Sequence, residues 1–334
     1  MTYGGKLFKR LLLLTFVVAA VAIAAGSLIA IESNVESYKS VSRIPAQTAE
    51  PFPIGVDPRQ ATITEQVFID EFYVDQLAQR DTDNGSWWNQ VASQLQTNHL
   101  WQQLASPVSR IIVVWSGERT EEVAKNIGAV LRWDAEQQQT FTSLMHENDL
   151  DFTQGIIVPG RYITHRYATP EDVAADLKET YNKDIATRYT EDIEAILPLS
   201  ETLVIASLIE REASDFENMR EVSGVIWNRL FIDMALQLDA SLQYVKAEDP
   251  YEPAWWPAVR PADKFLDSPY NTYQNKGLPP APIANPSIEA IVAALNPRVT
   301  DCLYYFHSRS REYYCSETYE EHVTKLRQVY GQGS

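Results

Sequence analysis

The sequence predicts an α+β protein with an N-terminal transmembrane helix, a small β-α-α-β subdomain and a larger α+β domain. Three features support this prediction: an uncharged apolar run near the N-terminus, a strand-helix-helix-strand pattern over residues 109–168, and amphipathic helices followed by one hairpin over residues 169–334. The 334 residues are 45% hydrophobic and 22% charged, which is the composition of a folded chain rather than a disordered one.

Residues 11–31 predict the membrane helix. They include no charged side chain, and as a helix they extend roughly 31 Å, the thickness of a bilayer core. Basic residues in the cytoplasmic segment 1–10 and acidic residues after the run orient the helix with its N-terminus inside. We therefore expect a single-pass protein of the cytoplasmic membrane whose body lies outside the cytoplasm. The alternative is a cleaved signal peptide, which leaves the body in the same compartment.

Two further segments precede the subdomain. Residues 32–60 contain four prolines in a mostly polar stretch and predict an extended linker. Residues 61–108 form a Trp-bearing, helix-compatible region to which no function is assigned. The formal net charge of −17 argues against a nucleic-acid partner, because a phosphate backbone requires clustered Lys and Arg.

Residues 109–168 predict the β-α-α-β subdomain. A β-branched run at residues 111–115 comes first, helices follow from Thr120 and from Asp134, and a second apolar β-run covers residues 156–158. Trp115-Ser116-Gly117 follows the first strand, and Pro159-Gly160-Arg161 lies in the last strand, which continues to Tyr162-Ile163. Together these features resemble a LysM module, which implies binding of N-acetylglucosamine polymers. A purely structural subdomain is the alternative.

A helix from an N-cap at Ser200 to about Glu212 carries the candidate catalytic group. Three apolar side chains share a face with Glu212, namely Ile205, Leu208 and Ile209. Glu210 points about 200° away around the helix axis. Burial on the shared face disfavours the charged form of Glu212 and raises the carboxyl pKa, which suits a general acid. The alternative is that Glu212 ends the helix and turns to solvent.

Short blocks follow one another between residues 199 and 326. They are Glu210-Arg211-Glu212, Asn228-Arg229-Leu230, Leu236-Gln237-Leu238-Asp239, Tyr270-Asn271-Thr272-Tyr273, Gly277-Leu278-Pro279-Pro280 and Ala294-Leu295-Asn296-Pro297. In this order they resemble the YceG-like (MltG) family of endolytic murein transglycosylases. Where that family has Thr-Asp-Pro, this chain has Leu238-Asp239-Ala240, which leaves the substrate preference open.

The resemblance implies a lyase that cuts glycan strands of peptidoglycan between N-acetylmuramic acid and N-acetylglucosamine without hydrolysis. It assigns the catalytic role to Glu212, which protonates the leaving oxygen and then takes a proton from the muramyl 6-hydroxyl as a 1,6-anhydro sugar closes. The N-acetyl group of the substrate stabilises the charged centre, so no cofactor and no second carboxylate are expected. The expected partners are glycan strands and wall-synthesis enzymes, and the expected role is termination of nascent strands.

Seven polar residues of these blocks are candidates for substrate binding: Glu210, Asn228, Gln237, Asp239, Tyr270, Asn271 and Tyr273. Their hydrogen-bonding or stacking groups suit N-acetyl sugars, although each also suits a buried polar group that holds the fold. Asp239 is in addition a candidate for orienting Glu212. Trp255 and Trp256 lie in a divergent insertion and suit either sugar stacking or packing.

Cys302 and Cys315 flank a predicted hairpin with strands at 303–306 and 313–314 and a turn at 307–310. In that register they face each other, which fits a disulfide as well as two buried free thiols. The five histidines have no metal-ligand spacing, so we predict no metal site.

Two other classes of function stay open on the sequence. One is a non-catalytic peptidoglycan-binding scaffold. The other is a hydrolytic muramidase that uses Glu210 or Asp239 as a second carboxylate. The products distinguish the three classes, because a transglycosylase leaves anhydro ends, a muramidase leaves reducing ends and a scaffold leaves the strands intact.

Overall fold

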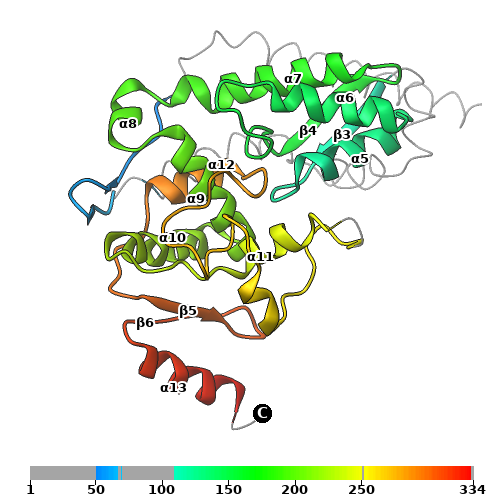
Figure 1. The fold of residues 1–334 in the computed structure, drawn as a ribbon. Helices are drawn as coiled ribbons and strands as arrows, with labels where there is room; N and C mark the ends of the chain where they lie inside the picture. Colours follow the sequence, from blue (N-terminus) through cyan, green and yellow to red (C-terminus); the bar gives the residue numbers. More distant parts are fainter. Residues whose placement is uncertain (1–49, 67–68, 70–108, 250–251, 332–334) are drawn as a thin grey trace, which may run out of the picture.

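The computed structural model describes residues 50–66, 69, 109–249 and 252–331 (Figure 1). The predicted cytoplasmic segment, the predicted membrane helix at residues 11–31 and nearly all of the Trp-bearing region lie outside the described residues. Among the residues that are described, no helix has the length and apolar character needed to cross a membrane. The described part has the predicted α+β composition.

Residues 50–66 pack against the body of the protein. The two short strands here, β1 (Val56–Asp57) and β2 (Thr62–Ile63), pair antiparallel. Phe52 is 2% exposed, and its main-chain N–H donates to the carbonyl of Arg188. The prediction of an extended linker is therefore wrong for residues 50–60, because their apolar side chains lie in the core despite the prolines between them.

The small subdomain has the predicted β-α-α-β order. Its elements are β3 (Ser109–Val114), α5 (Thr120–Leu131), α6 (Ala135–His146) and β4 (Gly160–His165). The two strands form one antiparallel sheet, with Ile112 opposite Tyr162, and the helices lie against it (Figure 1). Asp134 caps α6 as predicted, accepting a hydrogen bond from the main-chain N–H of Gln137.

The second strand of the subdomain, expected from Ile156 through Pro159-Gly160-Arg161 to Ile163, begins only at Gly160. Residues 156–158 are all buried but have no strand partner, whereas β4 alternates between partly buried and exposed residues. The main-chain N–H of Ile157 donates to the side chain of Asn285 instead of to a neighbouring strand. Apolar character without alternation therefore indicated burial here and not a strand.

Helix α7 (Pro170–Asp184) follows the subdomain and packs on α6. Its apolar residues Val173 and Leu177 lie in the same hydrophobic cluster as Ile112 and Phe141 of the subdomain. The predicted boundary after residue 168 thus separates α7 from the core on which it packs. A short 3-10 turn, η1 (Ala186–Arg188), and α8 (Glu191–Ile196) then lead to the second core.

The second core is built from helices around α9. These are α9 (Leu199–Glu212), α10 (Phe216–Phe231), α11 (Asp239–Lys246) and α12 (Ile288–Leu295), with the 3-10 turn η2 (Pro261–Phe265) beside α11. Residues Thr202–Ile209 of α9 are all buried, and α10 and α12 pack against this helix. The helix begins at Leu199, whose N–H donates to Glu194, so the prediction of an N-cap at Ser200 is wrong.

The C-terminal hairpin lies against the side of α10 that is far from the small subdomain, and the C-terminal helix packs on the hairpin (Figure 1). The hairpin strands β5 (Tyr304–His307) and β6 (Tyr313–Ser316) pair antiparallel, and α13 (Tyr319–Tyr330) follows. Cys302 and Cys315 form a disulfide with their Cα atoms 5.7 Å apart. Cys315 is opposite Tyr305 rather than opposite Cys302, so the predicted register is wrong. Of the two states that the sequence left open, the disulfide is the one present.

Candidate active site

Helix α9 places Glu212 at its last position, next to the core. Ile205, Leu208 and Ile209, the residues expected to share its face, are each 0% exposed. The helix ends because Ala213 is extended. Glu212 is partly buried as a result, with its side chain at the border between the core and the surface.

Two groups from other elements hydrogen-bond the Glu212 carboxyl group. The hydroxyl of Tyr305, in β5, donates to Oε2 at 2.9 Å. The main-chain N–H of Ala240, in the first turn of α11, also donates to this carboxyl. Three elements that are distant in sequence therefore meet at one side chain.

The environment of Glu212 raises its pKa. Desolvation by burial is the largest effect and raises the pKa, while the hydrogen bonds from Tyr305 and Ala240 lower it. The negative charge of Asp239 raises the pKa further, and the positive charge of Arg211 lowers it. The net rise keeps the carboxyl protonated to a higher pH than in water, which is the state that a general acid requires.

Asp239 and Tyr273 form a second carboxylate–tyrosine pair beside the first. The Tyr273 hydroxyl donates to Asp239 Oδ1 at 2.7 Å, and Asp239 is exposed at the first position of α11. Burial, together with this hydrogen bond and the charges of Asp239 and Glu212, raises the Tyr273 pKa. The two predicted residues thus lie together next to Glu212.

Arg229 supplies the positive charge of α10 to this region. Its Nε donates to the Leu303 carbonyl at 2.6 Å, and its Nη1 donates to the Leu236 carbonyl. The guanidinium interacts electrostatically with Glu212, although burial lowers its own pKa. Because both donors are used by main-chain carbonyls, Arg229 fixes the segments that lead into α11 and β5.

Glu210 and two asparagines of the predicted set have partners elsewhere in the protein. Glu210 Oε2 accepts hydrogen bonds from the N–H and hydroxyl of Ser287, the N-cap residue of α12. The amide of Asn228 donates to the carbonyls of Thr300 and Cys302. Asn271 is 0% exposed, and its amide group bonds main-chain groups of its own loop.

Gln237 and Tyr270 lie nearer the surface. Gln237 is exposed with a φ of 51°, and its main-chain N–H donates to the Thr272 carbonyl. The Tyr270 ring is 4.8 Å from the ring of Tyr244, centroid to centroid. Of the predicted residues, Asp239 and Tyr273 therefore lie next to Glu212. The other predicted residues make their contacts elsewhere.

Tyr305 and Arg229 are contacts that the sequence analysis did not single out. Arg229 lies inside the Asn-Arg-Leu block, whose pattern alone indicates no role for its side chain. Tyr305 is one of several aromatic residues in the hairpin, and nothing in the local pattern distinguishes the one that meets Glu212. Only the packing of β5 against α10 identifies it.

The insertion that contains Trp255 and Trp256 packs beside Arg211, the residue that precedes Glu212. The guanidinium carbon of Arg211 lies 3.8 Å from the Trp256 ring centroid, and Arg211 Nη1 donates to the Gly117 carbonyl of the small subdomain at 3.4 Å. Arg119 of that subdomain lies 5.8 Å from the Trp255 ring centroid. The insertion therefore stacks on arginines where the two cores meet.

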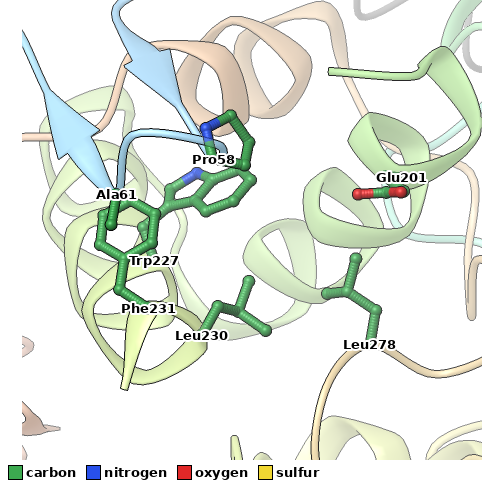
Figure 2. Close-up of a pocket in the computed structure, with 7 residues that line it drawn as sticks. All are labelled: Pro58, Ala61, Glu201, Trp227, Leu230, Phe231 and Leu278. Atoms are coloured by element: carbon green, nitrogen blue, oxygen red, sulfur yellow. The ribbon is translucent and has the colours of Figure 1, made fainter. Parts of the chain in front are cut away.

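Two surface pockets lie at opposite ends of α9. One of about 470 Å³ is lined by Trp227, Leu230 and Phe231 of α10 and faces Glu201, in the first turn of α9 (Figure 2). The other, of about 330 Å³, lies between Trp115 of the small subdomain and Glu210 of α9. Within the described ranges, no group of three or more His, Cys, Asp or Glu residues is placed to hold a metal ion.

The chain belongs to the YceG-like family, whose model matches residues 59–328. It is 32% identical over 152 residues to the endolytic murein transglycosylase of Streptococcus pneumoniae, a match that covers 46% of this chain and 27% of that protein. It is 32% identical over 170 residues to the enzyme of the same name from Bacillus subtilis, covering 51% of this chain and 46% of that one. The matched region thus spans less than half the length of either relative.

A solved structure has a similar fold. The crystal structure of a Listeria monocytogenes protein designated yceG-like superposes with a TM-score of 0.56 at 26% identity. The superposition covers 64% of this chain and 75% of the other. The similarity supports a YceG-like fold for the superposed part of the chain.

Proposed function

We propose that this protein is an endolytic lytic transglycosylase of peptidoglycan in which Glu212 is both the acid and the base. The observation that supports this most is one carboxyl group at a helix end whose burial raises its pKa. The family and the names of the relatives from Streptococcus pneumoniae and Bacillus subtilis support the same reaction class.

The proposed reaction uses one carboxyl group twice, first as an acid and then as a base. The protonated Glu212 gives its proton to the glycosidic oxygen between N-acetylmuramic acid and N-acetylglucosamine as the bond from that oxygen to C1 breaks. The N-acetyl group of the muramyl residue stabilises the cationic C1. The muramyl 6-hydroxyl then attacks C1 and loses its proton to the Glu212 carboxylate, which closes the 1,6-anhydro ring and regenerates the acid. No water is consumed.

Asp239 has a different proposed role from the nucleophilic carboxylate of a retaining glycosidase. Its negative charge raises the pKa of Glu212, and its exposed position beside Tyr273 suits hydrogen bonding to sugar hydroxyls. We assign Asp239, Gln237, Tyr270 and Tyr273 to the substrate-binding surface. Glu210, Asn228 and Asn271 stay weaker candidates for it, because protein groups already occupy their side chains.

The cellular setting follows from the same proposal. Residues 11–31 anchor the enzyme to the cytoplasmic membrane, with the catalytic domain outside, where glycan strands are made. The β-α-α-β subdomain is a LysM-like unit that holds the strand near the catalytic helix, and Trp115, which is 65% exposed at the pocket between the two, offers a ring for sugar stacking. Cleavage of nascent strands would end their elongation.

Mass spectrometry of digested peptidoglycan tests the proposal. The wild-type protein should release glycans with 1,6-anhydro-N-acetylmuramic acid ends, and Glu212→Gln should release none while still binding glycan strands. Glu201→Gln, at the exposed first turn of the same helix, is the matched control and should cleave like wild type. Reducing ends would establish a muramidase instead, and intact strands would establish a scaffold.

A further inference from the structure

The hairpin strand β5 delivers one side chain to the candidate catalytic carboxyl group. The Tyr305 hydroxyl lies 2.9 Å from Glu212 Oε2. The Tyr305 ring is itself held, because it stacks on Tyr313 at 6.0 Å and meets the His307 ring edge-on at 6.1 Å, centroid to centroid. A partly buried ring fixed on two sides leaves the hydroxyl little freedom to leave the carboxyl.

Other groups face Glu212 from every element packed around it. They are Arg211 on α9, Arg229 on α10, Asp239 on α11, Tyr273 in the loop after η2 and Tyr305 on β5. The two arginines are directed elsewhere: Arg211 stacks on Trp256, and Arg229 bonds main-chain carbonyls. In the described part of the chain, Tyr305 is thus the side chain that donates a hydrogen bond to Glu212.

We propose that Tyr305 is the positioning residue for Glu212: its hydroxyl holds Oε2, so that Oε1 carries the proton to and from the substrate. This inference rests on the proposed transglycosylase function and goes beyond it, because it assigns the two carboxyl oxygens different tasks. A carboxyl held at one oxygen presents the other in a single orientation, which suits an acid that must reach two different substrate oxygens in turn.

The protons balance over the two steps, because Glu212 gives one proton and takes one back. In the first, Oε1–H gives its proton to the glycosidic oxygen, and the new carboxylate charge is stabilised at Oε2 by the Tyr305 O–H. In the second, Oε1 takes the proton of the muramyl 6-hydroxyl. Tyr305 keeps its own proton throughout, because burial and the nearby Glu212 raise its pKa well above the ordinary value of 10.0.

The pH profile of cleavage distinguishes positioning from a merely structural role. Tyr305→Phe removes one oxygen and keeps the ring. Without that donor the Glu212 carboxylate is less stable, so the alkaline limb of kcat/KM should move up by about one pH unit. The maximal rate should fall about tenfold, because the carboxylate that forms in the first step loses a charge-assisted hydrogen bond.

Tyr313→Phe is the matched control. Tyr313 lies on the partner strand, its ring stacks on that of Tyr305, and its buried hydroxyl has no hydrogen-bond partner among the described residues. The control should therefore keep the wild-type limb and rate. Replacement of Tyr305 by 3-fluorotyrosine, a stronger donor that keeps the fold, should move the limb to lower pH, opposite to the phenylalanine variant.

All three variants are assayed as the full chain on purified glycan strands, with thermal unfolding measured alongside. Opposite shifts from the two Tyr305 replacements, with none from Tyr313→Phe, support the inference. If both replacements leave the limb at the wild-type pH while wild type forms anhydro ends, the inference is overturned and the proposed function stands. If the wild-type protein forms no anhydro ends, both are overturned.

Discussion

Cys315 lies directly opposite Tyr305 in the β5–β6 ladder, and the Tyr305 hydroxyl bonds Glu212. The disulfide from Cys315 to Cys302 therefore closes the hairpin beside the residue that contacts Glu212. Asn228 and Arg229 of α10 add hydrogen bonds to the carbonyls of Cys302 and Leu303 at the entry of the hairpin. The disulfide therefore closes the hairpin, and hydrogen bonds from α10 hold its entry, next to the strand whose Tyr305 bonds Glu212 of α9.

Replacing both cysteines with alanine should destabilise the protein and weaken cleavage. The bridge closes a loop between residues 13 apart in the sequence, and loop entropy predicts a loss of about 3 kcal/mol in the free energy of unfolding. Cleavage should fall because Tyr305 then occupies its position beside Glu212 for a smaller fraction of the time. Denaturant titration and the rate of anhydro-end formation measure the two effects.

A double-mutant cycle separates the two effects of the disulfide. In a Tyr305→Phe background the cysteine replacements should still lower stability but change the rate of cleavage little, since the hydroxyl that the hairpin positions is already absent. Equal losses of rate in both backgrounds would show that the disulfide acts on the site through some other contact.

Glu212→Gln should make the folded protein more stable at neutral pH while abolishing cleavage. The folded-state pKa of Glu212 is raised above its ordinary value of 4.5, so its contribution to stability is full below pH 4.5 and is lost as pH rises through the folded-state pKa. Glutamine carries no charge to bury and can still accept the Tyr305 hydrogen bond. Thermal unfolding should therefore show wild type and Glu212→Gln equally stable at low pH. As the pH rises above 4.5, Glu212→Gln should become increasingly more stable than wild type.

Glu201→Gln provides the control for that measurement. Glu201 is exposed in the first turn of the same helix, so its replacement should give no advantage that grows with pH. If Glu212→Gln is no more stable than wild type at any pH, burial does not disfavour the charged carboxylate of Glu212. The argument for a raised pKa then fails.

Asp239→Asn should move the alkaline limb of cleavage in the direction opposite to Tyr305→Phe. The negative charge of Asp239 raises the pKa of Glu212, so its removal should shift the limb to lower pH by roughly half a unit. The asparagine oxygen can still accept the Tyr273 hydrogen bond. Asp233→Asn, at an exposed residue paired with Lys276, is the control and should leave the profile unchanged. A shift to higher pH would contradict the assigned electrostatic role.

The position of Glu212 could be predicted because it depends on local periodicity alone. A helix face is fixed by 3.6 residues per turn, so three buried apolar residues in α9 were enough to place the carboxyl beside the core. The contact from Tyr305 could not be predicted in this way, because it joins residues 93 apart in sequence. Helical patterns carry no information about which distant strand packs against them.

The register of the hairpin is a second feature that could not be predicted from the sequence. The aromatic residues of its strands fit either register, so the length and conformation of the loop determine the register. The expected four-residue turn places Cys302 opposite Cys315. In the structure the loop includes Arg311 with a φ of 66°, and Ser308 donates its N–H to the Glu312 carbonyl. A left-handed arginine is uncommon and gives no sequence signal of the kind that glycine or asparagine gives.

Asn285→Ala should loosen the small subdomain from the catalytic core. Asn285 is 0% exposed, and its side chain accepts the N–H groups of Gly155 and Ile157 and donates to the Glu118 carbonyl. Its removal leaves buried main-chain groups of the subdomain without partners, at a cost of about 3 kcal/mol. Amide hydrogen exchange at Gly155 and Ile157 should become faster.

Asn271→Ala distinguishes loss of this junction from general destabilisation. Asn271 is equally buried, and its side chain bonds the carbonyls of Lys264 and Leu266 and the N–H of Tyr273, all within the catalytic domain. Both variants should unfold at lower denaturant concentration, but only Asn285→Ala should lose protection at Gly155 and Ile157. Under the proposed LysM-like role of the subdomain, a long glycan strand would contact both parts at once, so cleavage of long strands should fall more than cleavage of short ones in Asn285→Ala. Unchanged protection in Asn285→Ala would mean that the remaining contacts between the two parts, the Arg211–Gly117 hydrogen bond and the packing of Arg119 on Trp255, suffice to hold them together.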